Sequence, residues 1–467
     1  MRTKRATEGA ELENRQLIDH SNGEPIDEGD SGSNPSSADE TPVWGFFIIG
    51  FISLLCYNFF LQVIGFLSLK TGASFISAAP LAYGIFNNVG QLLCIFLGPS
   101  LPWGPRFWFS TTVVGIVGMG YSIIAVPGWS VGFKYGIGVS CLLGLGNAVF
   151  QSAAFGLAGL SGARAMNYMN FGQSFAGVLT LPLLLLLKRL FRWIARAEVA
   201  SQESGVSGVI SNSILAGFAL VSILTFLFIP YYSIYLSKTA TVRRAQDAAI
   251  TSIATGSSDR RSIMIIIWQT LPLALMVWLV LLVTFLVFPG IVLSWEPNVL
   301  TKHLSKGTYK ACLIYCFQVF DAVGKLSALV GLSLSPLLLK IFSPWRIMLG
   351  VCFFASTTSL AFISNDWTRF FLVAFLAFTN GLMITWCMIW GSSQVRKSEV
   401  DVASYTMSFF LVFGIACGSF IAYGLNVYTT IQQLPLEWFG MSELDHETVV
   451  FSSFTHGDGP IYIGPPN

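Results

Sequence analysis

Long apolar runs recur along this chain, separated by short stretches that carry most of its polar residues. A helix of about 20 apolar residues crosses the roughly 30 Å hydrocarbon core of a bilayer. Within the runs the apolar residues do not alternate with a period of two, which argues against the strands of a membrane β-barrel. The pattern predicts eleven helical spans, at about 43–69, 78–101, 107–127, 135–161, 167–187, 210–236, 263–291, 310–335, 344–364, 369–392 and 402–428.

The longest internal hydrophilic stretch, 237–262, separates the first six spans from the last five. We therefore expect an all-α polytopic membrane protein with a 6+5 bundle, its helices within 43–236 and 263–428 and a cytoplasmic loop at 237–262. Residues 1–42 are rich in Ser, Gly, Pro and Asn and hold ten of the 24 acidic residues. This composition predicts a disordered cytoplasmic tail. Residues 429–467 are expected to form an extracellular tail.

Composition supports a membrane protein, because only 11% of the residues are charged and the mean hydropathy is +0.66. Soluble domains have about 25% charged residues. The distribution of Lys and Arg favours a cytoplasmic N-terminus, since the 237–262 loop alone holds Lys238, Arg243, Arg244, Arg260 and Arg261. Against this assignment, the basic residues between 188 and 196 would then lie outside.

The eight cysteines all fall within apolar spans, so no framework of disulfide bridges is expected. The four histidines lie in the tails or in a loop, and no metal site is predicted. No phosphate-binding loop or Ser/His/Asp set is present either. The sequence thus predicts a protein that is not an enzyme, with no cofactor, no nucleic-acid partner and no obligate protein partner.

The predicted span 310–335 carries two charged residues near its middle, Asp321 and Lys325. A charge at the centre of a membrane helix costs about 2.5–3.5 kcal/mol on insertion scales. The i, i+4 spacing places both groups on one helix face, with the acid first. Of all the acids and bases, these two alone are expected at membrane depth. They form either a self-neutralising pair that holds the helix to its neighbours, or a polar face that binds a solute in an aqueous cavity.

Amide side chains form a second polar signal within the spans. A single amide is typical of a hydrogen bond between membrane helices. Because an amide both donates and accepts, several of them together with one acid and one base predict a hydrogen-bonding path through the bundle. The amides are Asn58, Asn87, Asn88, Gln91, Asn147, Gln151, Gln173, Gln318 and Asn380.

Short motifs within these spans follow one another in an order that resembles the equilibrative nucleoside transporter family. They are 54–60 (LLCYNFF), 85–89 (IFNNV), 151–159 (QSAAFGLAG), 172–177 (GQSFAG), 283–289 (VTFLVFP), 317–325 (FQVFDAVGK), 379–381 (TNG) and 408–410 (SFF). The resemblance implies an eleven-helix bundle related to the major facilitator fold, which works by alternating access. It also implies a multi-pass protein of the plasma membrane. The loops between spans 1 and 2 and between spans 6 and 7 are short beside those of mammalian members, which favours a protozoan purine-salvage transporter.

The resemblance further implies a set of substrate-binding residues. Three of them depart from the family pattern: Tyr57 stands in place of tryptophan, Gln318 in place of asparagine and Lys325 in place of arginine. Lysine is a point charge that cannot repeat the fork of donors of a guanidinium, so substrate preference is expected to depend on Lys325. The candidate residues are Leu54, Tyr57, Asn58, Leu61, Gln151, Gln318, Asp321, Lys325 and Ile415.

The favoured function is facilitative transport of nucleosides or nucleobases, with purines as the expected substrates. One alternative is a proton-coupled symporter of the same substrates in which Asp321 titrates. A second alternative is a membrane sensor or structural protein whose polar residues only hold helices together. The choice among nucleosides and free bases stays open.

Overall fold

The computed structural model describes residues 44–433, except 73, 74, 128, 130, 199–204, 240, 241, 244–246, 248–260, 289, 290, 293, 294, 296, 303–305 and 356–364. Eleven helices in this part are long and apolar enough to cross a membrane, which confirms the predicted number. They are α2 (Trp44–Thr71), α3 (Phe75–Leu97), α4 (Trp103–Ala125), α5 (Phe133–Leu160), α6 (Ala163–Glu198), α7 (Gly205–Ile234), α9 (Ile263–Val287), α11 (Lys306–Leu329), α12 (Pro336–Ala355), α13 (Asp366–Ser393) and α14 (Val400–Gln433). The predicted tail 1–42 lies outside the described residues, as do most of 237–262 and of 429–467.

One predicted span begins eight residues earlier than expected, and residues 356–364 of that prediction lie outside the described residues. The expected span 344–364 is α12, which runs from Pro336 to Ala355. Proline is well placed at the start of a helix, where its missing N–H has no intrahelical acceptor. Pro344 lies inside α12 rather than at its start, which membrane helices tolerate because neighbouring groups satisfy the freed backbone carbonyl. Arg346, expected at a span end, therefore lies in the middle of a helix.

Helix α6 is also longer than predicted, because it continues to Glu198 instead of ending near residue 187. The added part contains Lys188, Arg189 and Arg192. Lysine and arginine are good helix formers, but they end an apolar run. Hydropathy therefore locates the part of a helix that lipid can cover and misses an extension of the same helix beyond it.

The first six helices and the last five repeat one pattern of packing. In the first set (α2–α7), the first helix packs on the fifth, α6, and the second on the fourth, α5. In the second set (α9 and α11–α14), α9 packs on α14 and α11 on α13 in the same order. The third helix of the first set, α4, packs on the sixth, α7. The second set has five members, and the face of α12 that carries Leu337 and Trp345 is exposed, at 67% and 66%.

Glycines allow the four repeated pairs to approach backbone to backbone. Small residues favour such contacts between membrane helices, where no hydrophobic effect drives association. A side-chain carbon at any of these glycines would clash with a carbonyl oxygen on the partner helix. The distances would be 2.2 Å from Gly172 to Phe47, 2.5 Å from Gly144 to Tyr83, 2.5 Å from Gly418 to Leu282, and 2.2 Å from Gly381 to Asp321.

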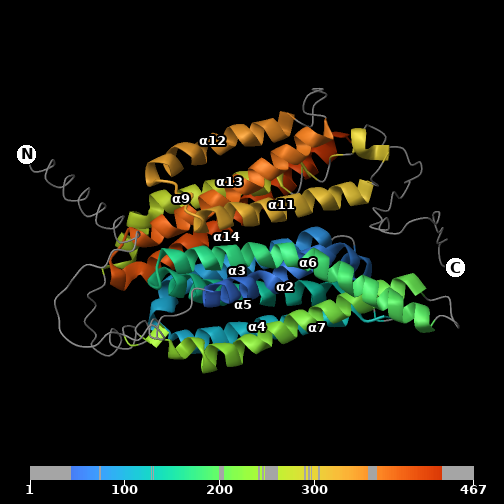
Figure 1. Cartoon of the computed structure of the whole chain (residues 1–467), viewed down its shortest axis with the longest axis horizontal. Coiled ribbons are helices and arrows are strands. Elements are labelled where there is room, and N and C mark those ends of the chain that lie inside the picture. The colour runs from blue at the N-terminus through green and yellow to red at the C-terminus, as the bar shows by residue number, and fades with distance from the viewer. Residues whose placement is uncertain are drawn as a thin grey trace, which may run out of the picture. The chain divides into compact units, whose positions relative to one another are not determined.

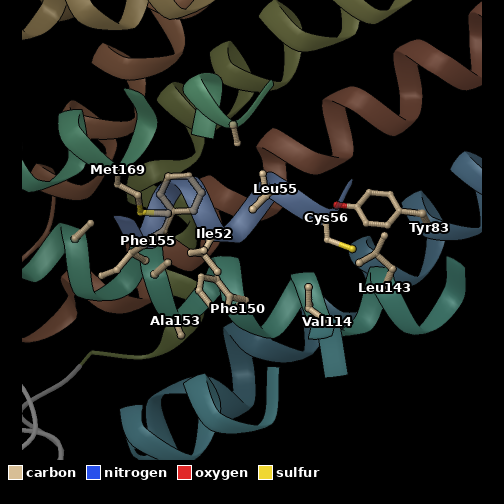
Figure 2. Packing of buried hydrophobic residues seen from close by; sticks show 14 of the residues in the cluster. Ile52, Leu55, Cys56, Tyr83, Val114, Leu143, Phe150, Ala153, Phe155 and Met169 are labelled. Atoms are coloured by element: carbon tan, nitrogen blue, oxygen red, sulfur yellow. The ribbon is translucent and has the colours of Figure 1, made fainter. Parts of the chain in front are cut away.

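Part of the buried apolar core lies between α2 and α5 (Figure 2). Ile52 and Leu55 of α2 pack there among Phe150 and Phe155 of α5, and all four side chains are buried. This apolar packing holds α2 so that its polar residues, further along the helix, face a fixed set of neighbours.

The two sets lie side by side, with α6 next to α11 and with α14 next to α3 and α5 (Figure 1). Several contacts between the sets lie towards the end of the bundle where α5 leads into α6. The Nη1 of Arg106 donates to the hydroxyl of Tyr405 over 2.7 Å, and the guanidinium lies 4.0 Å from the ring centre of Trp103. Gly159 leaves room for Ser404 of α14. The start of α14 is thereby fixed to the first set.

An ion pair stabilises the same end of the second set. Glu399 lies in a short 3-10 turn (Lys397–Glu399) before α14, and its side chain is fully buried. Its carboxylate accepts three hydrogen bonds from Arg261, which precedes α9: from the backbone N at 3.1 Å, from Nε at 2.9 Å and from Nη2 at 2.6 Å. These bonds lower the pKa of Glu399 from 4.5 to about 2. The pair therefore joins the starts of α9 and α14.

We expect Glu399→Gln to lower the stability of the protein at neutral pH by about 1–3 kcal/mol, because a charge-assisted hydrogen bond is weakened. The pKa of Glu399 is depressed in the folded state, so its contribution is complete above about pH 5 and is lost as the pH falls towards 2. Thermal unfolding in detergent, followed from pH 7 to pH 3, measures both effects. The wild type should lose more stability than the variant over this range, and parallel pH profiles would contradict the assignment.

Candidate functional site

The carboxylate of Asp321 lies in the interior of the bundle, with 8% of the residue exposed. Its Oδ1 accepts a hydrogen bond from Nδ2 of Asn380 on α13, over 2.8 Å. Its Oδ2 accepts one from the hydroxyl of Ser174 on α6. The same oxygen lies 3.3 Å from Nζ of Lys325, one turn further along α11. A buried charge needs such partners, and here they come from three helices of both sets.

Lys325 is as buried as Asp321, with 8% of the residue exposed. The predicted pairing of these two side chains on one face of the helix is confirmed. Removing one member of a buried pair leaves the other charge uncompensated, which typically costs about 3–5 kcal/mol. The pair is thus a structural feature of α11 whatever else it binds.

Arg346 is a second basic residue at membrane depth, so the expectation that Lys325 was the only one is wrong. It is 4% exposed. Its Nη2 donates to Oγ1 of Thr284 on α9 over 2.8 Å, and its Nη1 donates to Oγ1 of Thr379 on α13. The Thr284 hydroxyl lies 2.9 Å from Oδ1 of Asn380. A hydrogen-bonded chain therefore runs from Arg346 through Thr284 and Asn380 to Asp321.

The position of Arg346 could have been predicted from a helix with the correct bounds. The buried residues of α12 recur at intervals of four and three, which places them on one helix face. Arg346 is the central member of this row, so it must point inwards. The residues are Leu339, Ser343, Arg346, Gly350 and Phe353.

Close contact between α11 and α13 places Asn380 beside Asp321. A side-chain carbon at Gly324 would lie 2.2 Å from the carbonyl oxygen of Phe378. One at Gly381 would lie 2.2 Å from the carbonyl oxygen of Asp321 itself. The two helices therefore touch through their backbones at the acidic residue and in the turn that follows it, and this close approach allows the 2.8 Å bond to the amide.

Several predicted amides of the first set gather around Tyr83. The hydroxyl of Tyr83 accepts hydrogen bonds from Nδ2 of Asn87 and from Nδ2 of Asn147, each over 3.1 Å. The ring of Tyr57 stacks on the ring of Tyr83, with 4.0 Å between centres and 16° between planes. The Oδ1 atoms of Asn87 and Asn147 are buried without a hydrogen-bond partner among the described residues. We call Tyr57, Tyr83, Asn87 and Asn147 the tyrosine cluster.

Other amides form single hydrogen bonds between helices. Gln91 on α3 donates through Nε2 to Oε1 of Gln151 on α5 over 3.1 Å. Gln173 on α6 donates to the hydroxyl of Ser53 on α2 over 3.2 Å. Asn88 on α3 donates to the backbone oxygen of Val412 on α14 over 3.5 Å, which joins the two sets. The predicted path of amides is thus a series of local contacts.

The remaining candidate residues lie on α2, α11 and α14. Leu54, Asn58 and Leu61 share the face of α2 that carries Tyr57, since they are spaced by three and four residues. Leu54 and Tyr57 are partly buried, as is Ile415 on α14, whereas Leu61 is 37% exposed. Gln318 lies against Gly177 of α6, one turn before Asp321. We call Ser174, Gln318, Asp321, Lys325 and Asn380 the acidic cluster, to which sequence reasoning had not assigned Ser174.

A family model described as "Nucleoside transporter" matches residues 137–427. Among curated proteins, the chain is 26% identical over 312 residues to equilibrative nucleoside transporter 1 of Rattus norvegicus, covering 60% of this chain and 66% of that protein. It is 23% identical over 454 residues to equilibrative nucleoside transporter 1 of Homo sapiens, covering 81% and 95%. The chain spans just under two thirds of the length of the rat and mouse relatives.

Two solved structures with a similar fold are sugar:proton symporters. The proton:xylose symporter XylE of the major facilitator superfamily superposes with a TM-score of 0.53 at 14% identity, covering 84% of this chain and 88% of that chain. The fucose:proton symporter FucP of E. coli gives a TM-score of 0.50 at 10% identity, covering 83% and 92%. At these identities the likeness shows the fold alone, and it confirms the major facilitator arrangement of the helices.

We expect Gly381→Ala to destabilise the protein by about 1–3 kcal/mol or more, because the new carbon cannot fit between α11 and α13 without moving the backbone. Gly138 on α5 is the matched control, since a side-chain carbon there meets nothing within 4 Å. Gly138→Ala should leave stability unchanged or raise it by about 0.5–1 kcal/mol through helix propensity. Melting temperature and monodisperse yield in detergent measure both variants. Equal behaviour of the two would contradict the close contact.

Proposed function

This chain belongs to the nucleoside transporter family, and we propose that it carries nucleosides or nucleobases across a membrane by facilitated diffusion. The observation that carries the proposal is the buried carboxylate of Asp321, which lies in the family-like motif 317–325 at the contact between the two sets of helices. The family consists of transporters, so no catalytic role is assigned to any residue. Purines are the proposed substrates.

The two clusters suit the two parts of a nucleoside. A planar base can stack on an aromatic ring, and Tyr57 provides one that Tyr83 already supports from behind. Leu54, Leu61 and Ile415 would supply the apolar wall around it. Buried amide oxygens without partners, as at Asn87 and Asn147, offer hydrogen-bonding capacity to the polar edge of a base.

Asn58 and Gln151 would also bind the base edge, following the resemblance to the family. Asp321 would accept a hydrogen bond from a ribose hydroxyl or from a base N–H, and Lys325 balances its charge from 3.3 Å away. Gln318 would contact the same part of the substrate. A neutral substrate brings no additional charge into the site, which fits moderate affinity and ready release.

The packing of the helices supports alternating access. The repeated pairing within each set makes each set a unit, and rocking of one such unit against the other is the common mechanism of transporters built from repeats. The hydrogen bonds that join the sets include Arg106–Tyr405, Asn88–Val412 and Ser174–Asp321. Such contacts can break and form again without unfolding either set.

The protein spans the membrane several times, and we place it in the plasma membrane with the N-terminus in the cytoplasm. In this orientation the 237–262 loop and the 1–42 tail are cytoplasmic and the 429–467 tail is extracellular. A role in purine salvage, in a protozoan in particular, follows from the family resemblance and the short loops. Protease protection of an epitope placed in each tail tests the orientation.

Uptake of radiolabelled adenosine and hypoxanthine, in cells that lack their own nucleoside uptake, tests the function. We expect saturable uptake by the wild type and a loss of more than about tenfold for Asp321→Ala, since a hydrogen bond to a charged group contributes about 1.5–3 kcal/mol. Asp321→Asn keeps the shape of the side chain and should lose nearly as much. Surface expression is the control for both. Unimpaired uptake by Asp321→Ala would contradict the assigned role.

Proton-coupled symport is the second candidate, because Asp321 is a carboxylic acid at membrane depth that accepts hydrogen bonds from both sets of helices. Coupled transport accumulates substrate above the external concentration, and a protonophore abolishes this accumulation. Facilitated diffusion stops at equal concentrations and is insensitive to the protonophore. The same uptake assay, followed to steady state, separates the two.

A further inference from the structure

The three groups around the carboxylate of Asp321 differ in how they are held. Asn380 and Lys325 belong to the same set of helices as Asp321, and α13 and α11 meet there through glycine. Ser174 belongs to α6, in the other set. Any relative movement of the two sets therefore changes the distance from Ser174 to Asp321, but leaves the other two partners in place.

Both acceptor positions on Oδ2 of this carboxylate are already in use. A carboxylate oxygen offers about two lone-pair sites. Oδ2 of Asp321 faces both the Ser174 hydroxyl and Nζ of Lys325, and Oδ1 faces Asn380. A substrate hydroxyl or N–H that binds at Oδ2 must replace one of its two partners. Replacing Lys325 would leave a buried charge unbalanced, whereas replacing Ser174 exchanges one neutral donor for another.

We propose that the Ser174 hydroxyl acts as a stand-in for the substrate. In the empty transporter this hydroxyl occupies the hydrogen-bonding position at Asp321, and a nucleoside displaces it on binding. The proposal rests on the proposed function, because it takes Asp321 as a substrate contact. It assigns to Ser174 a role in affinity and specificity. The binding free energy that the substrate gains at Asp321 is only the difference between its own hydrogen bond and the Ser174 bond that it replaces.

A displaced serine on a helix has another acceptor within reach. Its hydroxyl can turn to the carbonyl oxygen four residues earlier in the same helix. Other buried serines of the first set already do so: Ser152 donates to Ala148 over 2.7 Å, and Ser213 donates to Val209 over 2.6 Å. Rotation of Ser174 about one bond would therefore free Asp321 without leaving a buried hydroxyl unpaired.

The exchange also acts on the contact between the sets. The Ser174–Asp321 bond joins α6 to α11, and Gln318 lies against Gly177 one turn further along the same contact. A substrate that takes the place of Ser174 removes a direct bond between the two sets and becomes the bridge itself. Substrate binding and the freedom of the sets to move are thereby linked through one side chain.

The test compares adenosine with 2′-deoxyadenosine and 3′-deoxyadenosine in wild type and in Ser174→Ala. The variant leaves Asp321 short of one donor, so we expect the KM of adenosine to fall by about tenfold. The KM of the analogue that lacks the interacting hydroxyl should stay unchanged. Ser213→Ala is the matched control, since it removes a buried hydroxyl of the same set that bonds only its own backbone, and it should change neither value.

Ser174→Cys provides a second variant if the alanine variant does not fold, because a thiol is nearly isosteric and a weak donor. It should shift the KM of adenosine in the same direction by a smaller factor. Binding to purified protein, measured by the rise in melting temperature that each nucleoside causes, should change in the same way: adenosine should bind more tightly to the Ser174 variants than to the wild type, and the analogue that lacks the interacting hydroxyl should bind equally to both. A general loss of packing would change the KM of all three substrates alike and would not lower any of them.

The outcomes separate the two proposals. If the wild type takes up neither adenosine nor hypoxanthine, the proposed function fails and this inference fails with it. If the wild type transports and the Ser174 variants change the KM of adenosine and of both analogues equally, or not at all, the inference alone is overturned. A rise in the KM of adenosine would also overturn it, since Ser174 would then assist the substrate instead of competing with it.

Discussion

The carboxylate of Asp321 sets the constraint on which the interior of this protein depends. At this depth neither lipid nor bulk water can solvate a charge, so the helices around it must supply donors. Asn380, Lys325 and Ser174 do so directly, and Arg346 continues the hydrogen-bonded chain through Thr284. Five helices, α6, α9, α11, α12 and α13, are thereby positioned with respect to one residue.

Glycine contacts make this arrangement possible. A chain of hydrogen bonds across several helices requires fixed distances, and side chains of ordinary size between α11 and α13 would separate Asn380 from Asp321. Gly324 and Gly381 let the two backbones touch at the acid and in the turn that follows it. The same device recurs in the other repeated pairs, so both sets of helices are rigid units. The contacts between the sets, in contrast, use side chains that can exchange partners.

The sequence was sufficient for the number of helices, because apolar length is a direct consequence of membrane thickness. It was also sufficient for the pairing of Asp321 with Lys325, which follows from the spacing within one helix. It failed for α12, where Pro344 was treated as a boundary although proline is tolerated inside a membrane helix. That single displacement moved Arg346 from the interior to a span end.

The partners of Asp321 from other helices lay beyond local sequence reasoning. Asn380 was recognised as one amide among nine, and nothing in its own neighbourhood connects it with α11. Ser174 lies in the family-like motif 172–177, but the motif does not assign it a partner, because a serine in an apolar helix usually bonds its own backbone, as Ser213 does. Only the contact between α6 and α11 makes it different from other serines.

Two basic residues near Asp321 have different roles: Arg346 donates hydrogen bonds to neighbouring helices, and Lys325 balances the charge of the acid. Arg346 uses its guanidinium to donate to hydroxyls on two neighbouring helices, which its planar fork of donors favours. Lys325 supplies a compact charge 3.3 Å from the carboxylate and has no fixed direction of donation. A point charge balances the acid without prescribing which of its lone pairs are filled, so one position on Oδ2 is taken by a neutral donor, the Ser174 hydroxyl. The lysine at the position where the family has arginine is therefore consistent with a site in which neutral donors exchange.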